Sequence, residues 1–129
     1  MEVRLIEVIN KNNDKTLEKR IKNKIKVELK KIEFTLSYNG TMYLIDIIYI
    51  LYTLKVYHNF NLEKDIYPIL VEKYETSSNN IKNNIENAIE KMFFDCDEEI
   101  LEDYIDDYDY SKPKPKMIIR AVLKRIKHL

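Results

Sequence analysis

The sequence predicts an all-α protein, a compact helical bundle that contains a helix-turn-helix. The chain has one Gly and three Pro in 129 residues, and this scarcity of turn formers favours helices over hairpins. Apolar residues recur every three or four positions along most of the chain, which places them on one face of successive helices. Because 45% of the residues are hydrophobic, the chain can bury the core of one domain of ordinary size.

The first helix of the domain is expected to begin at Lys15. Residues 1–14 form an N-terminal segment that the sequence leaves open between strand and helix, and residues 15–129 form the helical domain. Asp14 can cap the helix that follows. The apolar stripe of this helix lies opposite a strongly basic face and consists of Leu17, Ile21, Ile25, Leu29 and Ile32. A connector is expected over residues 35–40, in which Gly40 is the one residue able to adopt a positive φ without strain.

The second predicted helix, residues 41–57, is apolar nearly all round, which indicates burial at the centre of the domain. Tyr43, Tyr49 and Tyr52 are interpreted as core or boundary aromatics because they fall at helical spacing. The apolar run contains Asp46 and is shorter than the roughly 20 residues that span a bilayer. It therefore predicts a buried helix and no membrane segment.

A helix-turn-helix is predicted over residues 62–94. Its first helix, residues 62–74, has Pro68 in its first turns, where a missing N–H group is tolerated. A polar turn over residues 75–78 then offers helix-capping side chains. The second helix begins at Ser78 and ends at Phe94, with one apolar face made of Ile81, Ile85, Ala88, Ile89, Met92 and Phe93. A capped amphipathic helix after a short turn is the arrangement in which the second helix can enter a DNA major groove.

Two further segments complete the predicted bundle. Residues 95–110 are expected to form an acidic helical segment with Ile100, Leu101, Tyr104 and Ile105 facing inward. Lys112-Pro113-Lys114-Pro115 is expected to be extended, because a residue before proline is disfavoured in the helical region. A last basic amphipathic helix follows over residues 117–126.

Charge is strongly segregated along a chain of zero net charge. Residues 15–31 contain eight Lys and Arg against two Glu, residues 95–110 contain nine acids and no base, and residues 111–129 contain seven bases and no acid. Opposite blocks can pair within the fold, or each can meet an outside partner. The sequence leaves both interpretations open.

Several short landmarks, in the same order and with few gaps, resemble one known family. They are Gly40-Thr41-Met42-Tyr43-Leu44 at the buried helix, Ile66-Tyr67-Pro68 and Ala88-Ile89-Glu90 in the helix-turn-helix, and Lys112-Pro113-Lys114-Pro115 before the last helix. From about Ile21 to Leu129 the chain resembles the C-terminal DNA-binding effector domain of the sporulation stage-zero master response regulators of spore-forming bacteria. The phospho-receiver domain that precedes this module in relatives is not found, so phosphorylation is not expected to be the switch here.

The resemblance implies an all-helical domain whose recognition helix, residues 78–94, reads a short promoter box. It also implies binding as a homodimer and a contact with the sigma factor of RNA polymerase through residues 95–108. The chain departs from its relatives on the exposed face of the recognition helix. Where they carry Arg and His, it has Asn80, Asn83, Glu86 and Asn87.

The residue types of the recognition helix suit A·T-rich duplex DNA. Asn pairs bidentately with adenine, so the candidate base contacts are Asn79, Asn80, Asn83, Asn84 and Asn87. Lysines neutralise phosphates, and the candidate phosphate contacts are Lys82, Lys22, Lys24, Lys26, Lys112, Lys114 and Lys116. The other interpretation is that the Asn residues form a solvated face enriched by codon bias in an AT-rich genome.

The acidic segment supports a second hypothesis. Its carboxylates would repel phosphates, so they are candidate contacts for a basic protein partner: Asp95, Asp97, Glu98, Glu99, Glu102 and Asp103. In that case the chain is a protein-interaction module that binds a regulator, a sigma factor or a recombinase, for example as a recombination directionality factor.

No enzyme, cofactor or metal site is expected. His58 and His128 are far apart in the sequence, and Cys96 has no evident base beside it. A calcium loop at Asp95 fails because Ile100 stands where the loop glycine belongs. A lone cysteine and a charged N-terminus without a signal-peptide core predict a cytoplasmic protein.

Overall fold

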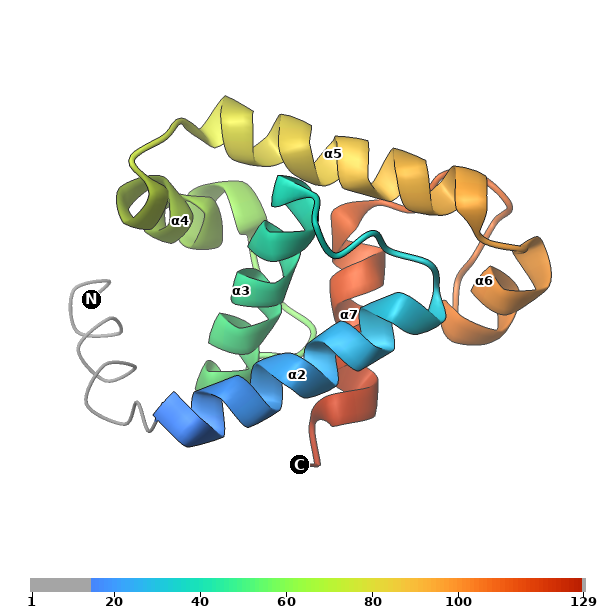
Figure 1. The fold of residues 1–129 in the computed structure, drawn as a ribbon, viewed down its shortest axis with the longest axis horizontal. Helices are drawn as coiled ribbons and strands as arrows, with labels where there is room; N and C mark the ends of the chain where they lie inside the picture. Colours follow the sequence, from blue (N-terminus) through green and yellow to red (C-terminus); the bar gives the residue numbers. More distant parts are fainter. Residues whose placement is uncertain (1–14, 129) are drawn as a thin grey trace.

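The computed structural model describes residues 15–128, which form a bundle of helices without a strand (Figure 1). The elements are α2 (Lys15–Lys31), α3 (Asn39–Leu54), the π-helical turn η1 (Leu62–Ile66), α4 (Tyr67–Tyr74), α5 (Ser78–Asp95), α6 (Glu98–Tyr104) and α7 (Pro115–Ile126). The all-α prediction is confirmed. The N-terminal segment and the Asp14 cap lie outside the described residues.

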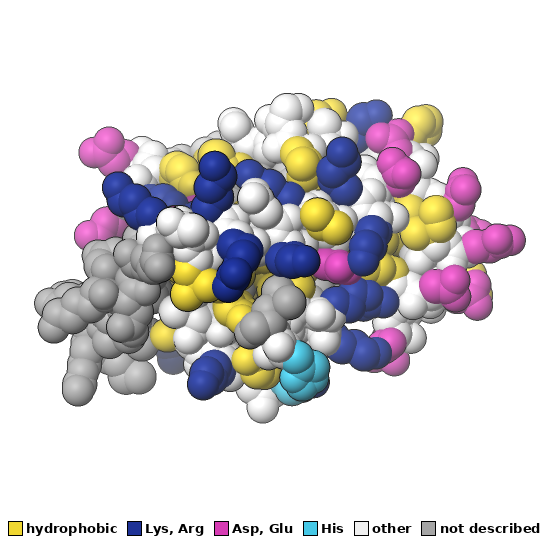
Figure 2. All heavy atoms as spheres, turned by 60° about the horizontal axis from the view of Figure 1, so that its bottom comes forward, with side chains coloured by type: hydrophobic (Ala, Val, Ile, Leu, Met, Phe, Trp, Pro, Cys, Tyr) yellow, Lys and Arg dark blue, Asp and Glu magenta, His cyan; other side chains and the backbone are white. Residues whose placement is uncertain are grey.

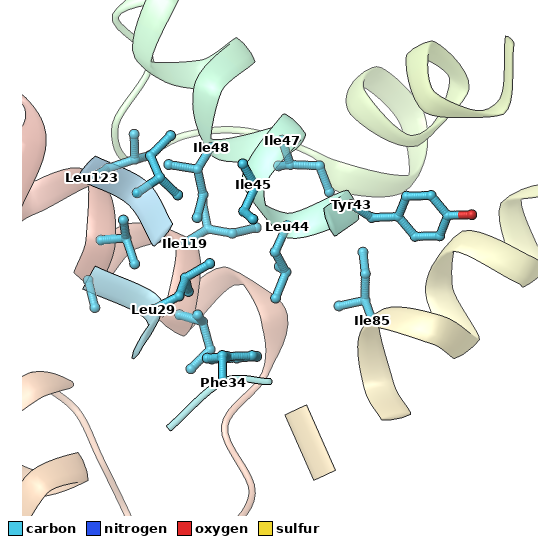
Figure 3. Packing of buried hydrophobic residues seen from close by; sticks show 14 of the residues in the cluster. Leu29, Phe34, Tyr43, Leu44, Ile45, Ile47, Ile48, Ile85, Ile119 and Leu123 are labelled. Atoms are coloured by element: carbon cyan, nitrogen blue, oxygen red, sulfur yellow. The ribbon is translucent and has the colours of Figure 1, made fainter. Parts of the chain in front are cut away.

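Helix α3 is the centre of the bundle. It packs against α2, α5 and α7, and the side chains of Leu44, Ile47 and Ile48 are fully buried. Figure 3 shows Leu44 and Ile48 on the side of Leu29 of α2 and Ile119 of α7, and Ile47 pointing toward Tyr43. The prediction of an apolar helix buried nearly all round is confirmed. No helix within residues 15–128 combines the length and hydropathy that crossing a membrane requires.

Helices α2, α3 and α4 all end at a residue with left-handed backbone that is not glycine. Glu33, Lys55 and Glu75 have φ angles of 69°, 57° and 51°. The N–H group of the residue after each of these donates a hydrogen bond to the carbonyl oxygen five residues earlier. The pairs are Phe34 with Leu29, Val56 with Leu51 and Thr76 with Val71. This is the Schellman pattern that glycine usually serves. Its use here follows from the scarcity of glycine in the chain.

The prediction that Gly40 belongs to the connector is wrong, and its φ is not positive. Gly40 is a helical residue in the first turn of α3, and it is buried against α5. A β-carbon at this position would lie 1.9 Å from the backbone oxygen of Asn84. The glycine therefore serves close approach of two helices and no turn.

Four smaller predictions are also corrected. Leu17 and Ile100 were assigned to buried faces, but they lie near the ends of α2 and α6 and are 42% and 38% exposed. Helix α3 ends at Leu54 and not near Tyr57, because Lys55 turns the chain. Helix α7 begins at Pro115, two residues earlier than expected, since proline fits the first turn of a helix.

Candidate nucleic-acid interface

The helix-turn-helix consists of α4, a turn over residues 75–77, and α5. Helix α4 crosses the start of α5, and the two are in contact (Figure 1). The hydroxyl of Ser77 accepts a hydrogen bond from the N–H of Asn80 at 3.1 Å, which fixes the first turn of α5. The predicted helix over residues 78–94 is confirmed to within one residue at its end.

Helix α5 has one buried face and one exposed face. Ile81, Ile85 and Ile89 are at most 1% exposed and pack into the core. On the other side, Asn79, Asn80, Asn83 and Asn87 are exposed, and Asn84 is partly buried at the flank. The predicted orientation of this helix, with isoleucines inward and asparagines outward, is confirmed.

The five asparagines differ in their hydrogen bonds. The Asn84 amide donates to the carbonyl oxygen and the side-chain oxygen of Asn80 at 2.8 and 2.9 Å, and the Asn80 amide donates to Thr76 at 2.7 Å. The side chains of Asn79, Asn83 and Asn87 have no hydrogen-bond partner within residues 15–128. Asn83 and Asn87 lie one turn apart along the outermost line of α5, where base edges would meet the helix.

Lys82, the candidate phosphate contact on α5, lies 3.5 Å from Glu63 in η1. Both side chains are largely exposed, at 48% and 70%. An ion pair of this kind is weak and screened by salt. Lys82 is therefore free to exchange Glu63 for a phosphate.

A buried carboxylate beneath the motif joins α2, α3 and α4. Asp46 of α3 is 6% exposed and accepts from Lys22 of α2 at 3.1 Å and from Lys73 of α4 at 3.0 Å. The hydroxyl of Tyr74 donates a further hydrogen bond to it. In the sequence, Asp46 stands out only as an interruption of an apolar run. Its role is to hold the first helix of the helix-turn-helix against the bundle.

This network shifts the pKa values of its members. Burial by itself would raise the pKa of Asp46, but the hydrogen bonds from Tyr74 and Lys73 and the charges of Lys22 and Lys73 outweigh it and lower that pKa below its ordinary value. Burial opposes the charge of Lys22, yet Asp46 raises the pKa of Lys22 overall. Lys22 is thus an internal counterion, which removes it from the lysines available to a phosphate.

The remaining candidate phosphate contacts lie on two sides of the molecule. Lys112 and Lys114 are exposed in the segment that leads into α7, and Lys116 lies in the first turn of α7 over the ring of Phe60. Helix α7 contacts α5. Lys24 and Lys26 are on α2, across α3 from α5 (Figure 1). The two groups cannot flank one straight duplex bound to α5.

The candidate protein-contact residues are gathered at the α6 end of the bundle. Asp95, Asp97, Glu98, Glu99, Glu102 and Asp103 are all exposed. One ion pair joins opposite charge blocks, Lys124 with Asp106 at 3.0 Å, while Asp95 pairs with Lys91 of α5 at 2.8 Å and Arg125 with Glu28 of α2 at 3.9 Å. We call Asp95, Asp97, Glu98, Glu99, Glu102 and Asp103 the acidic surface. Most of this surface still faces solvent.

Two observations bear on other kinds of site. Burial raises the pKa of the Cys96 thiol to about 11, so little thiolate exists at neutral pH. Within residues 15–128, His, Cys, Asp and Glu side chains do not gather in a group of three that could hold a metal ion. Among the described residues, neither a reactive thiol nor a metal site competes with the asparagine face of α5 as the candidate functional site.

Helix α4, its three-residue turn and the outward asparagine face of α5 define the class of a helix-turn-helix DNA-binding domain. Residues 25–126 match the family model described as "Sporulation initiation factor Spo0A C terminal", and the chain belongs to that family. It is a DNA-binding effector domain of the sporulation response-regulator type, a regulatory and not an enzymatic family. The match supports the first functional hypothesis and gives no support to the protein-interaction alternative. No curated protein matches the chain significantly.

Proposed function

We propose that this chain is a DNA-binding transcription regulator that reads A·T-rich sites in the major groove with the first three turns of α5. The observation that carries the proposal is the row of outward asparagines on a helix whose isoleucines are anchored in the core. Asn79, Asn83 and Asn87 are the base-contact residues, because their amides are not engaged within the described part of the chain. Asn80 and Asn84 support them from the flank.

The chemistry of α5 favours adenine over guanine. Asn presents one donor and one acceptor to N7 and N6 of adenine, whereas guanine is read by Arg or Lys. Helix α5 contains no Arg, and its two Lys residues are Lys82 and Lys91. Lys91 is paired with Asp95. A site for this chain is therefore expected to be richer in A·T pairs than a site read through arginine.

The distribution of charge favours the N-terminal half of α5 as the part inside the groove. The N-terminus of a helix carries partial positive charge, and the acidic surface begins at Asp95, at the opposite end. Insertion by the N-terminal end keeps these six carboxylates away from the phosphates and leaves Glu86 as the exposed acid on the inserted part of α5. Lys82, Lys112, Lys114 and Lys116 are then the lysines that contact the backbone of the same duplex.

The acidic surface is available to a protein once α5 is on DNA. Six exposed carboxylates fit a basic segment of a partner, and we assign this surface to a contact with the sigma factor of RNA polymerase. Sigma-factor binding and DNA binding use different surfaces of the domain, so each can be lost without the other. Charge reversal at Glu98 and Glu99 should abolish sigma-factor binding and leave affinity for the duplex unchanged or higher.

Fluorescence anisotropy tests the DNA-binding proposal. The full chain is titrated into an A·T-rich duplex and into a G·C-rich duplex of equal length, each at two salt concentrations. We expect tighter binding to the A·T-rich duplex. We also expect a steep loss of affinity as salt rises: the logarithm of the binding constant should fall with the logarithm of the salt concentration, with a slope of about −0.9 per neutralised phosphate. Equal affinity for both duplexes would contradict readout by asparagine, and no binding at low salt would contradict the function.

A further inference from the structure

Helix α2 has an exposed face that is basic on both flanks. On the helical wheel, Lys19, Lys26 and Lys30 lie on one flank and Arg20 and Lys24 on the other. All five side chains are exposed, and none is paired with an acid of residues 15–128. We call these five residues the α2 basic face. Figure 2 views this side of the molecule, with Lys and Arg side chains across its middle and Asp and Glu mainly toward its ends.

The two acids of α2 do not neutralise this face. Glu28 is 13% exposed at its side chain and accepts from Tyr104 at 2.9 Å and from Lys31 at 2.7 Å. Glu18 is turned to the flank of the core, where it lies 3.5 Å from Lys22. The acids therefore face inward and the five cations face outward. The five cations span residues 19–30 of α2, an unbalanced positive surface about 17 Å long at about 1.5 Å per residue.

The α2 basic face lies on the opposite side of the bundle from the exposed face of α5. Helix α3 packs against both helices and stands between them (Figure 1). A straight duplex held in its major groove by α5 is thus out of reach of the α2 cations. An anion that binds the α2 cations is therefore not the DNA segment that α5 reads.

We propose that the α2 basic face binds the phosphate backbone of a second DNA segment, so that one chain joins two duplexes. The proposal rests on the proposed function for the first duplex only. Lysines one helical turn apart are about 6 Å from each other, which suits the repeating charges of a phosphate backbone. A protein partner would need buried aromatic or apolar anchors, and lysine is depleted in the centres of such interfaces. The only large apolar residues exposed on α2 are Leu17 and Val27.

A bridging assay with the full chain tests the proposal. One duplex is fixed to beads, the chain is added, and capture of a second, fluorescent duplex is measured. We expect Lys24→Glu with Lys26→Glu to reduce capture by at least tenfold, while affinity for a single duplex in anisotropy changes by less than threefold. The matched control, Lys24→Arg with Lys26→Arg, keeps the charge and should capture like the wild type.

Four results would overturn the proposal. Capture by the Glu variant at the wild-type level would show that the face does not hold DNA. Equal loss of single-duplex affinity in this variant and in an α5 variant, Lys82→Glu with Asn83→Ala, would place both faces on one duplex. Sedimentation of the bridged complex with two chains per duplex pair would assign bridging to self-association. If the α2 basic face bound poly-glutamate but the chain captured no second duplex, the face would be assigned to an acidic protein.

The α5 variant separates this proposal from the DNA-binding function. If that variant binds a single duplex as the wild type does, the proposed function fails whatever happens to bridging. If the α5 variant loses single-duplex binding and the α2 variant loses only capture, both proposals are supported. Circular dichroism of each variant checks the fold, which we expect to be unchanged because all the substituted side chains are exposed.

Discussion

Gly40 of α3 lies so close to Asn84 of α5 that no side chain fits between them. A β-carbon on Gly40 would be 1.9 Å from the backbone oxygen of Asn84 and 2.9 Å from the Cα atom of Ile85. The backbone of the helix that we assign to DNA reading is thus seated directly on the first turn of the central helix. This contact also fixes the position of Asn83, the residue before Asn84.

Gly40→Ala should destabilise the protein and weaken DNA binding. The added methyl group meets backbone, which cannot turn aside as a flexible side chain could, so we expect a loss of about 1–3 kcal/mol in the free energy of unfolding. Urea denaturation measures the stability, and anisotropy measures the affinity. The control is Asn39→Ala, an exposed neighbour in the same helical turn. Unchanged stability for Gly40→Ala would mean that the two helices are not in this contact.

The Asp46 network should make stability depend on acid. The folded pKa of Asp46 lies below its unfolded value of about 3.9, so its contribution is complete above that pH and is lost as the pH falls through the lower, folded pKa. Asp46→Asn should therefore cost about 1–3 kcal/mol at pH 7 and progressively less below pH 4. Urea unfolding of both proteins at pH 7, 4 and 3 measures the difference. A difference that grows on acidification has the wrong sign for this network.

Lys55→Gly should stabilise the protein. Lys55 ends α3 with φ at 57°, a left-handed conformation that costs a residue with a β-carbon about 1–2 kcal/mol. Glycine avoids this cost but loses about 0.4–1 kcal/mol through its more flexible unfolded chain, so the net gain should be about 0.5–1 kcal/mol. Thermal and urea denaturation measure it. Lys55→Ala is the control that removes the charge and keeps the β-carbon, and an equal gain from it would attribute the effect to charge.

The elements best predicted from the sequence are the helices that are buried on one side, because their apolar residues recur at a regular helical spacing. In α5 the isoleucines at 81, 85 and 89 fix which side faces the core, so both the helix and its outward asparagines followed. Leu17 and Ile100 were misassigned because each lies in the first turn of its helix, which can extend past the core that the pattern implies. The family resemblance covered the same central elements as the family match.

The remaining features depend on contacts between distant elements, which periodicity does not report. A glycine in a connector is equally consistent with a turn and with close packing of two helices, and Gly40 has the second role. Lys22 stands among other lysines in the sequence, but its place beside Ile21 and one turn from Ile25 puts it at the edge of the core, where it meets Asp46. That position on the helical wheel was the available signal. Which lysines share a face with α5 required the packing of α2, α3 and α5.

The double substitution Lys82→Glu with Asn83→Ala tests most directly whether the outward face of α5 is the surface that binds DNA. Both residues are exposed, so the free energy of unfolding should change by well under 1 kcal/mol. Affinity for an A·T-rich duplex should fall by at least tenfold, whereas Asn23→Ala, an exposed asparagine on α2, should leave it unchanged. Wild-type affinity in a stably folded double variant would contradict the assignment of this face to DNA.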